Sequence, residues 1–172
     1  SQRLSKWGVP DHILFSPAAS EIAHRTDTMP TLDVILSLSS HEPFEVPTID
    51  RYHHPYLNSI AYTDSCLGAF VDTLRQSEAW SKTLLIFVAD HGYPYPGDVQ
   101  NHEPRRYAIP IVWAGGAVKM HREVTTLCSQ IDLVPTLLSQ MAIDHSDYLF
   151  TKDVLASTAV PSAFYSFNDG FG

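Results

Sequence analysis

The chain has 172 residues, of which 44% are hydrophobic and 17% are charged, and its formal net charge is −8. This composition is typical of a globular protein with a sizeable core, and it excludes wholesale disorder. The negative balance excludes the basic surface expected of a non-specific nucleic-acid binder. It leaves room for an anionic substrate, because a bound cation reverses the local field.

The first half of the chain predicts one strand between two helices. DHILFSPAASEIA (11–23) predicts a short helix, and Met29-Pro30 separates it from the next element. LDVILSLSS (32–40) is an apolar run of strand length that ends at His41. Residues 55–77 then have helical spacing, and the stripe that Asp64 interrupts contains Leu57, Ile60, Leu67, Val71 and Leu74.

The second half predicts strands at TLLIFVA (83–89), IPIVWA (109–114) and SAFYSF (162–167). IDLVPTLLSQM (131–141) predicts a helix with Pro135 in its first turn. Continuous apolar strands that alternate with helices are typical of a parallel sheet covered on both faces. Since no linker or repeat divides the chain, we predict one α/β domain with a mostly parallel sheet flanked by helices.

Two cysteines, Cys66 and Cys128, have no CxxC spacing. We favour buried thiols over a disulfide, which stays open as the alternative, because a chain of this size needs no covalent cross-link.

No run approaches the roughly 20 apolar residues that span a bilayer, and no signal peptide opens the chain. The chain begins at Ser1 and ends just after a strand-like run, so we expect a piece of a longer protein.

The candidate chemistry lies where two predicted strands end. One strand stops at Asp90, His91 and Gly92, and the other stops at His41. Ligands of open α/β sheets bind outside the carboxyl ends of the strands, and a carboxylate with an imidazole suits manganese or zinc. The side chains of neighbouring residues in an extended strand point to opposite faces of the sheet. Asp90 and His91 can therefore bind one ion only if the backbone turns there, and Gly92 permits such a turn.

A second interpretation of the same residues makes Asp90 the cap of a following helix. The polar loop that follows carries His102, which is either solvated or part of the site. Its arginine pair, Arg105 and Arg106, is interpreted as solvated or salt-bridged.

Five segments occur together in an order that resembles the sulfatase branch of the alkaline phosphatase superfamily. They are WGVPDHILF (7–15), LSLSSHEPFEVP (36–47), the helix with Tyr62-Thr63-Asp64, VADHG (88–92) followed by NHEPRRYAIPIVWAGG (101–116), and QIDLVPTLL (130–138). Within that branch the chain most resembles lipoteichoic acid synthase-like phosphoglycerol transferases. The resemblance implies that residues 1–172 are the C-terminal portion of an alkaline phosphatase-like fold, a partial catalytic domain truncated at both ends.

The resemblance also implies residue roles. Asp90 and His91 match the pair that binds the catalytic divalent metal, and His41 matches a histidine that contacts the substrate phosphate. His102 is a looser candidate for a second substrate-binding histidine, and Trp7 receives no substrate role. No catalytic nucleophile is assigned, because the family's threonine and first acidic metal ligand are expected upstream. Manganese is the expected ion, with magnesium, calcium and zinc as alternatives, and half of a ligand set would hold it weakly.

The implied function is metal-dependent transfer or cleavage of a phosphate ester, such as phosphoglycerol passing from a lipid to a glycan. The expected partners are anionic lipid or glycan esters and no nucleic acid. By resemblance, the catalytic domain lies outside the cytoplasmic membrane, in the cell envelope, and a segment outside this chain anchors it. We expect this piece to be inactive alone.

Three alternatives stay open. The first is a sulfate-ester hydrolase. Neither cysteine lies in the C/S-x-P-x-R motif that such an enzyme requires, but that motif would lie upstream. The second is a degenerate, non-catalytic domain that binds glycan or lipid head groups. The third is a different metal-dependent α/β hydrolase, which requires an acidic cluster drawn from Asp98, Glu103 and Asp132.

Overall fold

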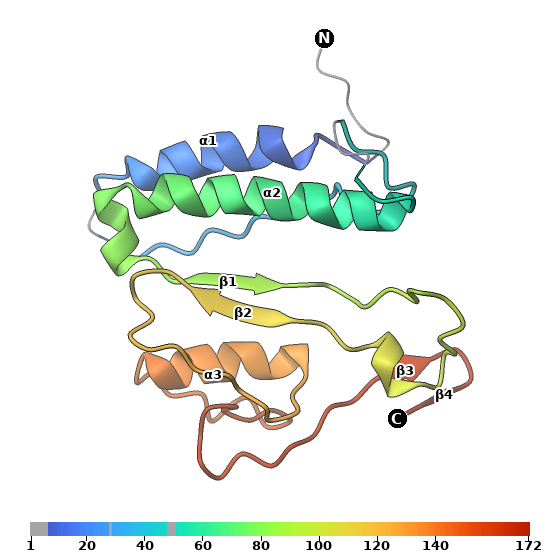
Figure 1. Ribbon diagram of the computed structural model, residues 1–172. Helices are drawn as coiled ribbons and strands as arrows, with labels where there is room; N and C mark the ends of the chain where they lie inside the picture. Colours follow the sequence, from blue (N-terminus) through green and yellow to red (C-terminus); the bar gives the residue numbers. More distant parts are fainter. Residues whose placement is uncertain (1–6, 28, 48–50) are drawn as a thin grey trace. The chain divides into compact units, whose positions relative to one another are not determined.

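The computed structural model describes residues 7–27, 29–47 and 51–172 (Figure 1). These residues form two compact units, and each is described by itself. The first unit contains Ser1–Leu85 and Trp113–Lys119, and the second contains Ile86–Val112 and Met120–Gly172. The predicted truncation at the start of the chain falls on residues 1–6, which lie outside the described residues.

Two helices form most of the first unit, and both were predicted. α1 (Asp11–Ala23) and α2 (Pro55–Arg75) pack side by side (Figure 1). Pro55 opens α2 at a position where the missing N–H has no intrahelical partner to lose. The predicted helix over 55–77 is therefore confirmed to within two residues of its end.

The core of the first unit lies between these helices. α2 buries residues at a spacing of four, Tyr62, Cys66, Phe70 and Leu74, so its apolar stripe follows one side of the helix. Phe15 of α1 packs on Phe70, with ring centroids 5.6 Å apart. The predicted stripe is wrong at Ile60, which is 42% exposed, because the large rings of Tyr62 and Phe70 decide which face turns inward.

Residues 31–38 contain no strand, so the predicted strand over 32–40 is wrong. The segment lies beside the core, with Ile35 packed against it, while Leu32, Val34 and Leu36 are 84%, 86% and 69% exposed. The reason is that a strand needs a hydrogen-bonded neighbour, and none of the described strands pairs with this segment. Arg25, just after α1, holds the segment through hydrogen bonds of 2.7 and 2.9 Å to the Asp33 carboxylate.

The strands β1 (Leu85–Val88) and β2 (Ile111–Ala114) form a two-stranded sheet. After β2, the Gly116 and Ala117 N–H groups donate to the carbonyls of Trp80 and Thr83, which precede β1, so the two strands run antiparallel. Trp80 lies in η1 (Glu78–Lys82). The helices and strands confirm an α/β fold, but β1 and β2 do not display the expected parallel pairing. A continuous apolar run indicates burial on both faces and does not fix the direction of each strand.

The second unit carries short elements joined by long loops. They are η2 (Pro104–Arg106), η3 (Gln130–Asp132), α3 (Leu133–Gln140), β3 (Ser166–Phe167) and β4 (Gly170–Phe171). α3 confirms the predicted helix, with Pro135 in its first turn. The predicted strand over 162–167 shortens to β3, which forms an antiparallel hairpin with β4.

Neither cysteine is bonded: Cys66 is buried and Cys128 is half-buried. Burial raises the pKa of both thiols. Among the described residues, no helix combines the length and apolar character that crossing a membrane requires.

Candidate metal and substrate site

The turn after β1 presents Asp90 and His91 at the surface of the second unit. One carboxylate oxygen of Asp90, Oδ1, accepts a hydrogen bond of 2.9 Å from the His91 backbone N–H. The His91 ring places Nδ1 2.9 Å from the carbonyl oxygen of Gly92. Because a carbonyl oxygen only accepts, Nδ1 carries the hydrogen, and Nε2 keeps the lone pair that a metal requires.

The remaining atoms of this pair fit a shared divalent ion. Asp90 Oδ2 lies 3.7 Å from His91 Nε2. Two ligands that each lie about 2.1 Å from one tetrahedral ion are about 3.4 Å apart, so a small side-chain adjustment brings both onto it. Both side chains are mostly exposed, at 77% and 69%. No cluster of three or more potential metal ligands occurs among the described residues.

The backbone of the turn is held by a residue far along the chain. Gln130 Nε2 donates to the carbonyl oxygens of Ala89 and Asp90, at 2.6 and 2.9 Å. Gln130 opens the QIDLVPTLL segment, which the sequence identifies as part of the family resemblance just before a predicted helix, without any sign of this contact. The helix-cap interpretation of Asp90 is wrong, because the next helical turn is η2 at Pro104 and the carboxylate closes its own turn instead.

Gly92 is needed at the turn for a reason other than the expected one. Its φ does not lie in the left-handed region that favours glycine. A Cβ at this position would lie 2.2 Å from the carbonyl oxygen of Arg106, a distance that real side chains do not adopt. Gly92 therefore lets the backbone at Arg106 lie directly against the Asp90–His91 turn.

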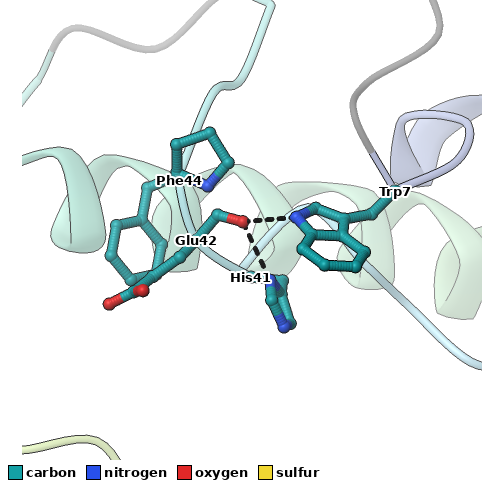
Figure 2. A pocket seen from close by; sticks show the side chains of 5 residues that line it. Trp7, His41, Glu42 and Phe44 are labelled. Carbon is teal, nitrogen blue, oxygen red and sulfur yellow. Dashed lines mark hydrogen bonds between the residues drawn. The ribbon is translucent and has the colours of Figure 1, made fainter.

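His41 lies in the first unit, in the loop that follows the extended segment (Figure 2). Its Nδ1 lies 2.8 Å from the carbonyl oxygen of Glu42, so this ring too carries its hydrogen on Nδ1. Figure 2 shows the other ring nitrogen pointing away from that carbonyl. His41 lines a cavity of about 460 Å³ together with Trp7, Glu42, Pro43 and Phe44.

Trp7 holds the His41 loop, a contact that sequence reasoning missed. Its indole N–H donates to the Glu42 carbonyl at 2.6 Å, and its ring centroid lies 4.8 Å from that of His41. Trp7 and Glu42 are 35 residues apart, so no local pattern signals the contact. Trp7 and His41 thus share one backbone acceptor and one cavity.

A buried carboxylate fixes the backbone that leads into His41. Asp11 is fully buried at the start of α1. Its Oδ1 accepts from the backbone N–H groups of Leu38 and Ser39, and its Oδ2 accepts from the Thr63 hydroxyl of α2. In return, the Asp11 N–H donates to the Ser39 hydroxyl oxygen at 3.0 Å. Two helices and the His41 segment are therefore joined at one point.

The other predicted substrate residue, His102, is exposed in the second unit, where its carbonyl oxygen accepts from Tyr165 at 2.9 Å. Its role in substrate binding stays a prediction. His41 belongs to the first unit, and Asp90, His91 and His102 belong to the second. The expected meeting of these side chains around one ion and its bound ester also stays a prediction.

The acidic cluster that a different metal-dependent hydrolase requires is not formed by the described residues. Asp132 is 2% exposed and accepts from the Lys152 ammonium at 2.7 Å and from the Ser129 N–H at 2.8 Å. Burial alone would raise the pKa of Asp132, but these hydrogen bonds outweigh burial and lower it. Glu103 is engaged by Arg105 at 2.6 Å, which also confirms the expected salt bridge of that arginine.

Comparison with known proteins identifies the family of the chain. The family model described as Sulfatase matches residues 2–143. Arylsulfatase K of Canis lupus familiaris is 30% identical over 87 residues, which are 48% of this chain and 16% of that protein. A crystal structure of a protein in the alkaline phosphatase superfamily from Vibrio parahaemolyticus matches 99% of this chain and 43% of its own, with 25% identity and a TM-score of 0.81.

The lipoteichoic acid synthase LtaP from Listeria monocytogenes has a similar fold, with a TM-score of 0.72 and 22% identity over 90% of this chain and 44% of its own. These matches define an alkaline phosphatase-like α/β fold. The chain belongs to the sulfatase family. It spans about a sixth of the arylsulfatase that it matches and less than half of either solved chain.

Proposed function

We propose that Asp90 and His91 bind a divalent metal, manganese first, in an enzyme that cleaves or transfers a phosphate or sulfate ester. The observation that carries the proposal is the 3.7 Å separation between Asp90 Oδ2 and His91 Nε2, with the opposite ring nitrogen fixed by the Gly92 carbonyl. Such a backbone partner orients a metal-binding imidazole and raises its basicity. The bound ion would stabilise charge on ester oxygens and lower the pKa of a nucleophilic hydroxyl.

His41 is proposed to contact the ester. The Glu42 carbonyl and the Trp7 ring hold the imidazole, so the ring lines the 460 Å³ cavity in one orientation. When Nε2 is also protonated, the ring donates a charge-assisted hydrogen bond to an anionic ester oxygen. His102 is the second proposed contact, from the loop that follows the metal-binding turn.

Transfer of phosphoglycerol from a lipid to a glycan hydroxyl is the first candidate reaction. It is supported by the fold shared with a lipoteichoic acid synthase over 90% of the chain, and by the His41 block. Sulfate-ester hydrolysis is the second candidate, and the identity with arylsulfatase K favours it. For the first reaction we propose an extracytoplasmic catalytic domain that a segment outside this chain anchors to the membrane.

The test uses the natural full-length protein and its Asp90→Ala and His91→Ala variants. Turnover is measured with bis(p-nitrophenyl) phosphate, phosphatidylglycerol and p-nitrophenyl sulfate, and manganese affinity is measured by titration calorimetry. We expect either ligand variant to lose at least about 100-fold in kcat/KM, since the ion carries several kcal/mol of transition-state stabilisation. Preference for phosphate or sulfate substrates distinguishes the two reactions.

The matched control is Glu123→Ala, which removes an exposed carboxylate elsewhere in the second unit. This variant should keep wild-type turnover and metal affinity. Near-normal turnover by Asp90→Ala would remove Asp90 from the metal site. A wild-type protein that binds glycans or lipid head groups but turns over none of the three substrates would favour the non-catalytic domain.

A further inference from the structure

A cavity of about 340 Å³ lies against the metal-binding turn in the second unit. Its walls come from three separate parts of the chain: the turn at His91, the loop at Asn101 and Arg106–Tyr107, and the β3–β4 hairpin at Phe167–Asn168. We name it the His91 cavity. A volume of this size lies at the lower end of the range for small-molecule sites, so it suits a head group or a single sugar better than a lipid chain.

Arg106 gives the His91 cavity an uncompensated positive charge. No carboxylate is among the residues that line the cavity. The neighbouring Arg105 is neutralised by Glu103 at 2.6 Å, whereas no ion pair to Arg106 occurs in the part of the chain that the structure describes. Arg106 is half-buried, and its guanidinium makes one long hydrogen bond of 3.4 Å to the Val99 carbonyl. Most of its donors are therefore available to a ligand.

The loop that carries Arg106 is held in place from both sides. The Tyr107 hydroxyl donates to the Asn101 carbonyl at 2.7 Å, which closes the loop. The Tyr107 ring stacks on Tyr165, with centroids 4.5 Å apart and planes inclined by 23°. Gly92 admits the Arg106 carbonyl at a distance that any side chain would prevent. The backbone that carries the Arg106 side chain is thus anchored next to the turn that offers Asp90 and His91.

The remaining lining groups suit a hydroxyl-bearing molecule. The Asn101 and Asn168 side chains are amides, each with two donors and one acceptor oxygen, which match both roles of an alcohol. Tyr107 and Phe167 supply aromatic surface for the carbon skeleton. A cation, two amides and aromatic rings together favour an anionic ester of a sugar or of glycerol.

We infer that the His91 cavity binds the substrate, with the Arg106 guanidinium on negatively charged oxygens of a phosphate or sulfate ester and the sugar or glycerol portion against the two amides and the rings. The inference rests on the proposed function and adds a substrate-binding residue to it. The sequence alone left Arg106 equivalent to Arg105, and the difference lies in which of the two has an acidic partner.

The experiment compares Arg106→Gln, Arg106→Lys and the matched control Arg105→Gln in the natural full-length protein loaded with manganese. KM and kcat are measured with the best substrate found for the wild type, and inorganic phosphate and sulfate are titrated as competitive inhibitors. Arg106→Gln should raise KM and both inhibition constants by about tenfold or more, because it removes charge-assisted hydrogen bonds. Arg106→Lys should recover part of this loss, since it keeps the charge without the two-pronged geometry.

Arg105→Gln should stay within about twofold of the wild type, and manganese affinity should be equal in all four proteins. Equal melting temperatures exclude loss of folding as the cause. If the wild type turns over substrate and Arg106→Gln and Arg105→Gln have the same KM and inhibition constants, the inference is overturned and the proposed function stands. If the wild type neither binds the anions nor turns over any ester, the proposed function itself fails.

Discussion

The Thr63 hydroxyl of α2 donates a hydrogen bond of 2.8 Å to the fully buried carboxylate of Asp11 at the start of α1. The same carboxylate accepts the N–H groups of Leu38 and Ser39, which lead into His41. One side chain therefore links the helical core to the candidate substrate-binding loop. A buried acid with three donors is a structural anchor, because each donor would otherwise be left without an acceptor.

Asp11→Ala is expected to destabilise the protein by about 3–5 kcal/mol, because it leaves one buried N–H, one half-buried N–H and one hydroxyl without their acceptor. The measurement is urea unfolding followed by circular dichroism. The matched control is Asp64→Ala, which removes an exposed carboxylate next to Thr63 on α2 and should shift the unfolding midpoint little. Equal midpoints for the two variants would show that the Asp11 contacts add no stability.

Gln130 should affect metal binding although it contacts no ligand atom. Its amide holds the carbonyl oxygens at Ala89 and Asp90, so Gln130→Leu frees the backbone that orients the Asp90 carboxylate. Loss of such supporting contacts typically costs about 10- to 100-fold in metal affinity. Titration of the full-length protein with manganese measures the effect, and Gln140→Leu at the exposed end of α3 serves as control. If Gln130→Leu binds manganese as tightly as the wild type, Gln130 contributes to packing and has no role in metal binding.

The local parts of this architecture could be predicted from the sequence. The helices over 11–23, 55–75 and 133–140 follow from apolar spacing and proline position, which act within a few residues. The Asp90–His91 turn was found because two ligand types stand together at the end of an apolar strand. The burial of α2 was predicted less well, since the residues facing α1 depend on the partner helix.

Non-local contacts could not be predicted. The strand expected over 32–40 has no partner among the described strands, and its apolar run looks the same in the sequence as that of a paired strand. The Trp7 contact to Glu42 and the Gln130 contact to Asp90 join residues 35 and 40 positions apart. Arg105 and Arg106 have different surroundings because η2 directs their side chains differently. The sequence of two adjacent arginines does not show these directions.

The ion pair between buried Asp132 and half-buried Lys152 should make stability depend on pH. Asp132 has a pKa below its ordinary value of 3.8, so the unfolded chain takes up the proton first as the pH falls. The contribution of ionised Asp132 to the free energy of unfolding is complete above pH 3.8. It is lost as the pH falls through the lower pKa that Asp132 has in the folded state. Asp132→Asn should therefore cost about 3–5 kcal/mol at pH 7, since it leaves the half-buried Lys152 ammonium without its carboxylate partner.

The measurement for Asp132→Asn is urea unfolding between pH 7 and pH 3, with a chelator present so that metal binding does not contribute. The difference from the wild type should stay constant down to about pH 5 and shrink below pH 3.8. Asp147→Asn, at an exposed position in the same unit, is the control. A deficit that is equally large at pH 3 and pH 7 would assign the effect to packing and not to the ion pair.

Two glycines should respond to alanine in opposite directions. Gly68 lies within α2, where an added Cβ would meet nothing within 4 Å, so Gly68→Ala should stabilise the protein by about 0.5–1 kcal/mol through the higher helix propensity of alanine. Gly92→Ala places its Cβ 2.2 Å from the Arg106 carbonyl and forces the loop away from the Asp90–His91 turn. We expect this variant to lose about 1–3 kcal/mol of stability and at least about tenfold in manganese affinity. Thermal unfolding and manganese titration of both variants test the prediction, because a harmless Gly92→Ala would mean that the close packing of Arg106 against the turn is not required for the site.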